Sequence, residues 1–187
     1  MKQGEQTRIK ILQAASKLFY QKGFHQTAFS DIVQETGLSK GNITYHFKSK
    51  EDILTAVFEK RIENTKAALA GLDTKFSDAK SRVGGFVDSL LKGKSELTRY
   101  GCRNGSLAYE LGKSENKTRE LSQHVFDLTK LWLTTQFLEL GFSAEQAKNN
   151  ALELLIRGQG ICVLSQVYND EKLFEDEVVK LKKLALS

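Results

Sequence analysis

The sequence predicts an all-α protein of about nine helices, and three observations lead to this prediction. Apolar residues recur at spacings of three and four along most of the 187 residues, as they do on one face of a helix. Glycine, serine or threonine stands at many of the points where these stripes begin or end. The chain contains no proline to interrupt a helix. We therefore expect a three-helix N-terminal domain, residues 1–50, and a larger helical body, residues 51–187.

The first expected helix covers residues 7–22 and ends at Gly23. Thr27 is expected to cap the second helix, which runs to Thr36. One face of the first helix is apolar at helical spacing and should pack inside the N-terminal domain. This face consists of Ile11, Ala14, Ala15, Leu18 and Phe19.

Residues 27–50, TAFSDIVQETGLSKGNITYHFKSK, contain the pattern that points to a function. The second helix stops at Gly37, because leaving a helix within so few residues favours a left-handed backbone. Ser39 suits the start of a third helix, where its side chain can accept a hydrogen bond from a free amide. Two short helices joined by a tight, glycine-containing turn are typical of a helix-turn-helix. The partner that this motif indicates is double-stranded DNA.

The third helix, residues 39–47, should carry the side chains that contact DNA. Ile43 and Phe47 are four residues apart and should face inward, which leaves polar residues outside. Lysine can bond guanine edges, asparagine can pair with adenine, and a threonine methyl can meet thymine. For His46, packing within the domain is an equally good interpretation. The expected DNA-binding residues are Thr27, Ser39, Lys40, Gly41, Asn42, Thr44, Tyr45, His46, Lys48 and Lys50.

The positive charge of the chain is concentrated in the N-terminal domain. Residues 1–50 hold eight Lys or Arg and three Asp or Glu, a balance of +5, whereas residues 51–187 hold 20 of each sign. Contacts with phosphates supply most of a protein's non-specific affinity for DNA. A basic head on a neutral body therefore favours DNA binding over a merely solvated basic face.

The segment GLSKGNITYHFKSKEDIL, preceded by RIKILQAASKLFYQKGFHQTAFSDIV, resembles the N-terminal domain of the TetR family of one-component transcriptional repressors. The resemblance covers about the first third of the chain. Thr44 stands where the family usually has an aromatic residue, and Ala28-Phe29 replaces a commoner small polar residue. The resemblance implies a homodimeric repressor that a small-molecule inducer releases from a near-palindromic operator. It also implies that Tyr45 bonds a phosphate.

The remaining six helices are expected in the body, where apolar stripes again have helical spacing. Ser49 is expected to cap the first of them, and Ser143 with Gln146 forms a capping-box pattern before a later one. The expected ranges are 51–69, 78–97, 99–111, 115–140, 143–167 and 172–186.

In the resembled family the body encloses a pocket for the inducer. Core packing is the alternative for each candidate side chain taken singly. Cys102 lies between Arg99 and Arg103, and nearby cations favour the reactive thiolate, so sensing of oxidants or electrophiles stands beside an inert role. The candidate pocket residues are Phe86, Arg99, Tyr100, Cys102, Arg103, Tyr109, Phe126, Trp132 and Gln136.

Small residues follow one face of the expected helix 143–167 and would let another helix come close. The resemblance implies that the last two helices of each subunit form a four-helix dimer interface. An ordinary face inside one chain is an equally good interpretation of the same residues. The candidate interface residues are Ala147, Ala151, Leu154, Leu155, Gly158, Ile161, Cys162 and Ser165.

Other classes of protein are less well supported by the residues. We find no nucleophile–base motif, no metal-ligand spacing and no glycine-rich phosphate loop, so we expect no enzyme, no catalytic or metal site and no cofactor. No apolar run is long enough to cross a membrane, and the N-terminus does not resemble a signal peptide, so we expect a cytoplasmic protein. The main rival is a helical ligand carrier or adaptor with an incidental basic head, which would bind DNA weakly and without regard to sequence.

Overall fold

The computed structural model describes residues 3–112 and 116–186, and within these ranges all the regular structure is helical. The all-α prediction is confirmed, with one helix more than expected because Gly93 divides the segment predicted at 78–97. The helices are α1 (Gln3–Lys22), α2 (Phe29–Thr36), α3 (Lys40–His46), α4 (Lys50–Lys75), α5 (Ala79–Lys92), α6 (Lys94–Tyr100), α7 (Arg103–Leu111), α8 (Asn116–Glu139), α9 (Ala144–Tyr168) and α10 (Glu171–Leu186).

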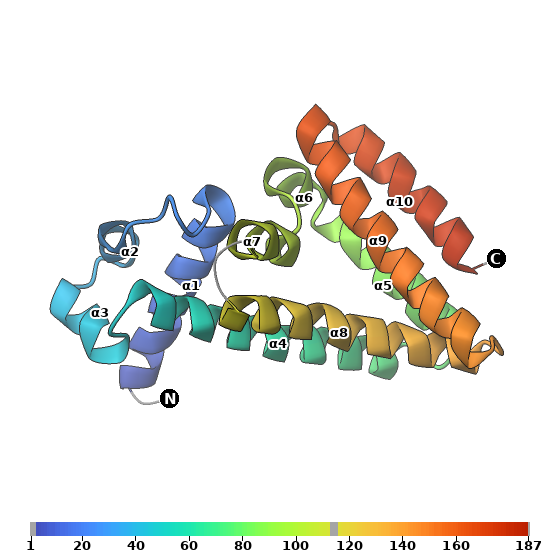
Figure 1. Ribbon diagram of the computed structural model, residues 1–187, viewed down its shortest axis with the longest axis horizontal. Helices are drawn as coiled ribbons and strands as arrows, with labels where there is room; N and C mark the ends of the chain where they lie inside the picture. Colours follow the sequence, from blue (N-terminus) through green and yellow to red (C-terminus); the bar gives the residue numbers. More distant parts are fainter. Residues whose placement is uncertain (1–2, 113–115, 187) are drawn as a thin grey trace.

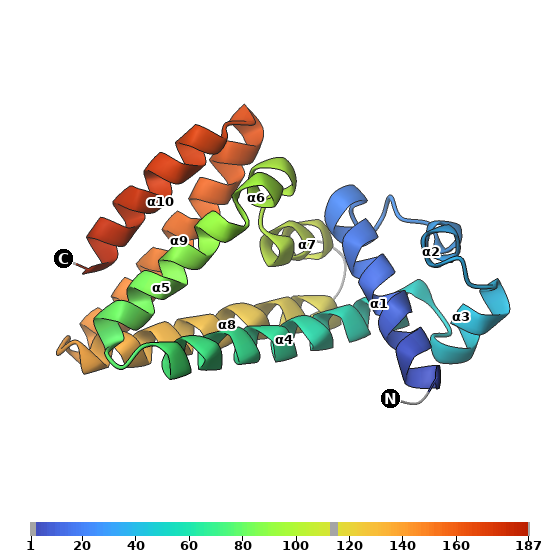
Figure 2. The same ribbon diagram turned by 180° about the vertical axis from the view of Figure 1, so that it is seen from behind.

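The molecule is elongated, with α2 and α3 at one end and the α9–α10 pair toward the other (Figure 1). The two longest helices of the middle, α4 and α8, run side by side along the long axis, as the view from behind also shows (Figure 2). The helix α7 lies beside α1 and so connects the body to the head. The range predicted for α8 began at Glu115, which lies outside the described residues.

The core of the head forms where α1, α2 and α3 pack on the start of α4. Apolar faces predicted from the sequence are buried in it, since Ile11, Ala15 and Ile43 are all fully inaccessible to solvent. Two residues of α7, Leu107 and Leu111, belong to the same cluster. The head therefore buries its apolar surface partly against the body, and the two share one continuous core at this point.

The core of the body lies between α5, α8, α9 and α10. Its central side chains are Val83, Leu133, Phe137 and Phe174, each at most 2% exposed. Ala147 and Ala151 of α9 are completely buried in the same cluster, where they let the neighbouring helices approach closely. The second core thus holds the last two helices against α5 and α8.

Several helix ends have the caps that the sequence predicts. Gly37 closes α2 in the left-handed region at φ 63°, and Ser39 caps α3 by accepting a hydrogen bond from the Asn42 amide at 3.2 Å. Ser49 caps α4 and exchanges bonds with Asp52 in a capping box. Ser143 and Gln146 form the predicted box at the start of α9.

The prediction that Thr27 caps α2 is wrong. Thr27 is fully buried, and its hydroxyl donates to the Gly23 carbonyl at 2.6 Å, so it neither caps α2 nor reaches solvent. The first turn of α2 is held instead by the Asp31 carboxylate, which accepts from the Ala28 amide at 3.0 Å. Threonine and aspartate side chains can both accept a hydrogen bond from a nearby amide, and here only the Asp31 carboxylate does so at the start of α2.

The ammonium of Lys50 makes its hydrogen bonds within the chain. Its ammonium donates to the carbonyls of Phe24 and Thr27, both at 2.8 Å, and lies 4.2 Å from the centroid of the Phe24 ring. The loop between α1 and α2 is therefore tied to the start of α4. The prediction of a phosphate contact for Lys50 is not supported, because two of its three N–H donors have partners within the chain.

Replacing Lys50 with methionine should destabilise the protein even without DNA. The variant loses two hydrogen bonds from a charged donor and leaves two loop carbonyls without it, which should cost about 1–3 kcal/mol. Urea denaturation measures this cost. Lys60→Met is the control, because Lys60 pairs with Glu63 on the surface of α4 and its loss should change stability little. Equal, small losses in both variants would contradict the structural role of Lys50.

Candidate functional site

The exposed face of α3 is the candidate DNA-binding surface, and the turn before it sets its orientation. Gly37 reverses the chain after α2, and Ser39 begins α3 within two residues. Ile43 is fully buried and Phe47 nearly so, which fixes the inner face of α3 against the head. The outer face, at one end of the molecule, is therefore presented by a firmly packed helix (Figure 1).

The beginning of α3 carries the side chains best suited to read base edges. Lys40 and Asn42 are exposed, and Gly41 between them adds no side-chain bulk. The Thr44 hydroxyl donates back to the carbonyls of Lys40 and Gly41, at 3.0 and 3.1 Å, which leaves its methyl group for apolar contact. An ammonium, an amide and a methyl group can together distinguish base pairs in a major groove.

The end of α3 carries side chains suited to phosphate contacts. Tyr45 is 79% exposed and meets the His46 ring edge-on, with ring centroids 5.1 Å apart. His46 itself is half-buried, as the packing interpretation expected. Lys48 is exposed and its ammonium donates to the Thr44 carbonyl at 3.2 Å, so it retains donors for an anion. A phenol and an ammonium at this end are suited to phosphate contacts, which position a protein on DNA, rather than to reading base edges.

Two ion pairs hold the first helix of the motif in place. Lys17 of α1 pairs with Glu35 of α2 at 2.6 Å, and Lys22 lies 4.0 Å from Asp31. These pairs use two of the basic residues counted in the head, and Lys50 is tied to loop carbonyls. The other described basic residues of the head are Lys40 and Lys48, on and beside α3, and Arg8 and Lys10 of α1, and all four are exposed.

The structure reveals contacts between head and body that the sequence did not predict. The Glu110 carboxylate of α7 accepts hydrogen bonds from the Phe24 and His25 amides, at 3.0 and 2.7 Å. The Tyr20 hydroxyl of α1 lies 2.8 Å from the Gly101 carbonyl and 2.9 Å from that of Glu96. No sequence motif marks these residues, because both contacts join segments more than 75 positions apart.

Burial keeps the Tyr20 phenol in its neutral, hydrogen-donating form. Loss of solvent is the main cause that raises its pKa to about 12, although the nearby Arg103 opposes the shift. The Arg103 guanidinium lies 4.7 Å from the centroid of the Tyr20 ring and pairs with Glu96. The junction between head and body is thus a polar cluster as well as an apolar contact.

The nine candidate pocket residues do not gather around one cavity. Tyr100 and Arg103 lie against Tyr20 of the head, whose ring packs edge-on on Tyr100 with ring centroids 5.3 Å apart. Cys102 packs against the second core, and Arg99 is exposed. Phe86, Trp132 and Gln136 lie toward the far ends of α4 and α8, as members of the second core or its border. Phe126 is half-buried in the middle of α8. Tyr109 is 77% exposed, so its assignment to a pocket is wrong.

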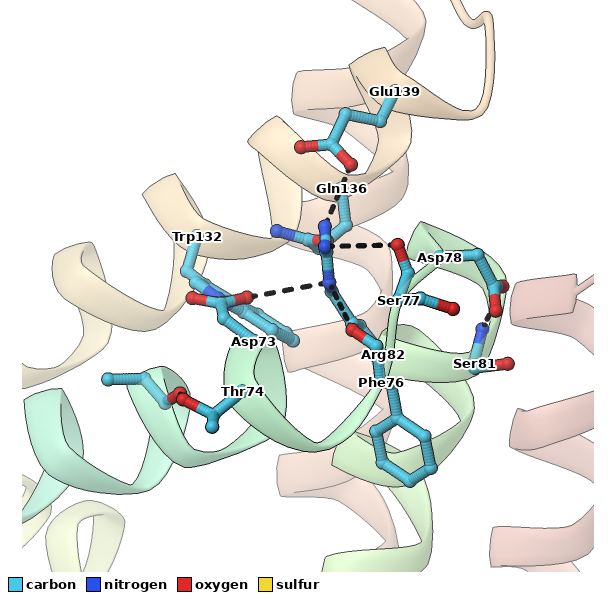
Figure 3. Close-up of polar contacts among 11 residues, drawn as sticks. Asp73, Thr74, Phe76, Ser77, Asp78, Ser81, Arg82, Trp132, Gln136 and Glu139 are labelled. Carbon is cyan, nitrogen blue, oxygen red and sulfur yellow. Dashed lines mark hydrogen bonds and ion pairs between the residues drawn. The ribbon is translucent and has the colours of Figure 1, made fainter.

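The polar groups around Trp132 already have partners within the chain (Figure 3). The indole N–H donates to Asp73, at 3.0 and 3.1 Å from its two carboxylate oxygens. Arg82 donates to Gln136 at 3.3 Å and to Glu139 at 2.8 Å, and it also bonds loop carbonyls after α4. This cluster ties together the ends of α4, α5 and α8 and has an evident structural role.

The two cysteines differ in their surroundings. Cys102 caps α7, where its sulfur accepts from the Gly105 amide and from the Gln159 side chain, both at 3.4 Å. Cys162 is 3% exposed, and burial raises the pKa of its thiol to about 12, which keeps it protonated and unreactive. Any thiol chemistry would therefore belong to Cys102.

The face of α9 nominated for dimerisation is mostly an internal face. Ala147, Ala151, Leu154, Cys162 and Ser165 are all buried within the chain, at most 4% exposed. Their small size lets α9 pack against its neighbours in the second core. For these residues the interface prediction is wrong, and the alternative of an internal core face holds. Leu155, Gly158 and Ile161 are half-buried.

The outer face of α9 and part of α10 is apolar instead. Ile156, Val163 and Val167 are 56%, 55% and 71% exposed, and with Leu152 they repeat at helical spacing. Nearby, Leu164, Tyr168 and Leu184 border a surface hollow of about 610 Å³ between α9 and α10. A stripe of this extent is unusual on the surface of a monomer. We call these seven residues the α9–α10 apolar surface.

Other types of site find no support among the residues that the structure describes. No group of three histidine, cysteine or acidic side chains is placed to hold a metal ion there. The same residues include no helix that is both long and apolar enough to span a bilayer.

Comparison with known proteins agrees with the geometry of the head. Residues 11–57 match the family model described as bacterial regulatory proteins, tetR family. An uncharacterized HTH-type transcriptional regulator of Lactococcus lactis is 27% identical over 94% of this chain and 91% of its own length. The fatty acid metabolism regulator protein of Bacillus subtilis is 36% identical, over 33% of this chain and 32% of its own.

Solved structures extend the likeness of fold to the body. A TetR transcriptional regulator from Chloroflexus aurantiacus superposes with a TM-score of 0.85 at 24% identity, over 98% of this chain and 96% of its own. A TetR transcriptional regulator from Legionella pneumophila gives 0.81 at 24% identity, over 94% and 95%. Head and body are therefore arranged as in these solved structures.

Replacing Asn42 with alanine should relax the preference for one base pair. If the amide pairs with adenine, its loss should cost about 1–3 kcal/mol on the preferred sequence and little on random DNA. Affinities for a selected sequence and its single-base variants measure this. Lys48→Ala is the comparison, since loss of a phosphate contact should weaken all sequences alike and reduce the salt dependence. An equal loss for Asn42→Ala on specific and random DNA would exclude base reading by this residue.

Proposed function

We propose that this protein, which belongs to the TetR family of transcriptional regulators, is a repressor that binds a near-palindromic DNA operator as a homodimer and is released by a small-molecule inducer. The observation that carries the proposal is the outer face of α3, where Lys40, Asn42 and Tyr45 are exposed on a helix fixed from behind by Ile43. Selection of bound sequences from a random DNA pool tests it, and we expect two related half-sites. A helical carrier with an incidental basic head would select none.

The residues proposed to contact DNA follow from the geometry of α3. Lys40, Asn42 and Thr44 would read bases, with Gly41 allowing close approach. Tyr45 and Lys48 would bind phosphates, and the exposed Ser39 hydroxyl, which accepts from Asn42, could still donate to a phosphate oxygen.

The boundary between the two domains is proposed near residue 50, with α4 shared between them. The first turns of α4 pack into the head core through Ile53 and Leu54, and later turns run along α8. A movement in the body would thus reach α3 through α4, and through the bonds that Glu110 makes to the loop before α2. Release of DNA by an inducer needs such a connection, because ligand and DNA bind at separate places.

A dimer is proposed because one head alone contacts few base pairs. Helix-turn-helix proteins place two recognition helices on half-sites about one turn of DNA apart, and protein symmetry mirrors operator symmetry. The α9–α10 apolar surface is the face we propose for the interface, since a second copy would remove its exposed side chains from water. This surface lies far from α3, so both heads would remain free for DNA (Figure 1).

The proposed location is the cytoplasm, where an operator on bacterial DNA is accessible. The absence of a bilayer-spanning helix from the part of the chain that the structure describes is compatible with this location.

Replacing Val163 with glutamate should convert the protein to monomers. Val163 is 55% exposed near the middle of the stripe on α9, so the change should not disturb the fold but should place two like charges in a two-fold interface. Sedimentation measures the oligomeric state, and operator affinity should fall at least a hundredfold although every residue of α3 is intact.

Leu131→Glu is the matched control. Leu131 is 67% exposed on α8, outside the α9–α10 apolar surface, and its replacement should leave both mass and DNA affinity unchanged. A Val163→Glu protein that remains dimeric and operator-bound would show that the subunits associate through another face.

A further inference from the structure

A cavity of about 460 Å³ lies at the junction of head and body. Its walls come from α1, α4, α6 and the first residue of α7, so neither domain encloses it alone. It is separate from the cluster around Trp132, whose residues contribute nothing to these walls. The size is within the range of small-molecule sites.

The cavity is apolar on one side and cationic on another. Ile9, Leu12 and Val57 supply apolar surface from α1 and α4. Four cations and one carboxylate also line it, which gives an excess of three positive charges before partners outside the cavity are counted. The charged residues are Lys17, Lys60, Arg61, Arg103 and Glu96.

Three of these cations have a carboxylate partner, and Arg61 does not. Lys17 pairs with Glu35, Lys60 with Glu63 and Arg103 with Glu96. Among the described residues no ion pair includes Arg61. One of its terminal nitrogens, Nη1, donates to the Arg103 carbonyl, whereas Nη2 is buried and has no hydrogen-bond partner.

Arg61 is half-buried and largely desolvated, and its guanidinium has no counterion among the described residues, which is unfavourable and lowers its pKa. Burial is the main cause that lowers the pKa of Arg61 to about 10, although the residue remains charged at neutral pH. Buried charges in proteins are normally paired, so an exception requires an explanation. An anion bound in the cavity beside Arg61 would supply the missing charge.

We propose that this junction cavity binds a small amphipathic monocarboxylate, whose carboxylate pairs with Arg61 and whose apolar part lies against Ile9, Leu12 and Val57. A single negative charge matches the one cation without a partner, and the planar guanidinium suits a carboxylate. Because α1 belongs to the head while α6 and α7 belong to the body, the bound molecule touches both.

Calorimetric titration of the full-length protein with octanoate tests the proposal. Octanoate combines a carboxylate with an apolar chain, and we expect one molecule to bind per chain. The same titration with 1-octanol, which keeps the chain and lacks the charge, should give at least tenfold weaker binding. Binding is measured without DNA, so the result does not depend on the proposed repressor function.

Arg61→Gln should weaken octanoate binding at least tenfold, because it removes the proposed counterion. The matched control is Arg99→Gln, since Arg99 carries the same charge on α6 but is exposed, stacks on Tyr100 and does not line the cavity. This control should bind octanoate as the unchanged protein does.

A second pair of variants covers the case in which Arg61→Gln does not fold. Asn64 is exposed and lines the cavity three residues after Arg61 on α4, so Asn64→Glu would place a resident carboxylate on its wall. This variant should also lose at least tenfold in affinity for octanoate, whereas Asn64→Gln should not.

Three results would overturn the proposal: no binding of octanoate, equal binding of 1-octanol, or full affinity for octanoate in Asn64→Glu or in a folded Arg61→Gln.

Discussion

The architecture depends on α4, a single helix that packs into the core of the head and continues along α8 and α5 of the body. Ile53, Val57 and Phe58 are buried in the core of the head, and the later turns lie along α8 in the body. Each turn of a helix is hydrogen-bonded to the next, so the element is stiff along its length. No flexible linker separates the two functional halves along this path. The orientation of α3 is therefore set partly by where the far end of α4 rests.

The junction beside α4 combines firm contacts with one unbalanced charge. Glu110 accepts from two amides of the loop before α2, and Tyr20 donates to the carbonyls of Glu96 in α6 and Gly101 after it, so these polar groups are satisfied. Arg61 is an exception among the charged groups, because its buried Nη2 donor is left without a partner. A polar group buried without a partner costs free energy. The junction therefore holds head and body together through satisfied polar contacts, but it leaves the charge of Arg61 without a counterion.

Local chemistry explains which features could be predicted from the sequence. Gly37, Ser39 and Ser143 act within a few residues of their own position, so their turns and caps were predictable. The contacts of Thr27 and Lys50 could not be predicted, because their partners are loop carbonyls, and in the case of Lys50 these lie more than 20 positions away. The candidate pocket failed to assemble for a related reason. Bulky and polar residues occur in any helical body, and only the packing of α5 to α9 decides which of them meet.

The two faces of α9 show why small residues alone do not identify an interface. Ala147 and Ala151 permit close approach of any helix, and in this chain the neighbours are helices of the same core. The opposite face carries Ile156, Val163 and Val167, which remain half or more exposed. Burying such side chains is favourable by roughly 25 cal/mol for each Å² removed from water, whereas small buried residues have nothing more to gain. Exposed apolar area, which becomes visible only once the monomer is packed, is therefore the better guide to where a second copy would bind.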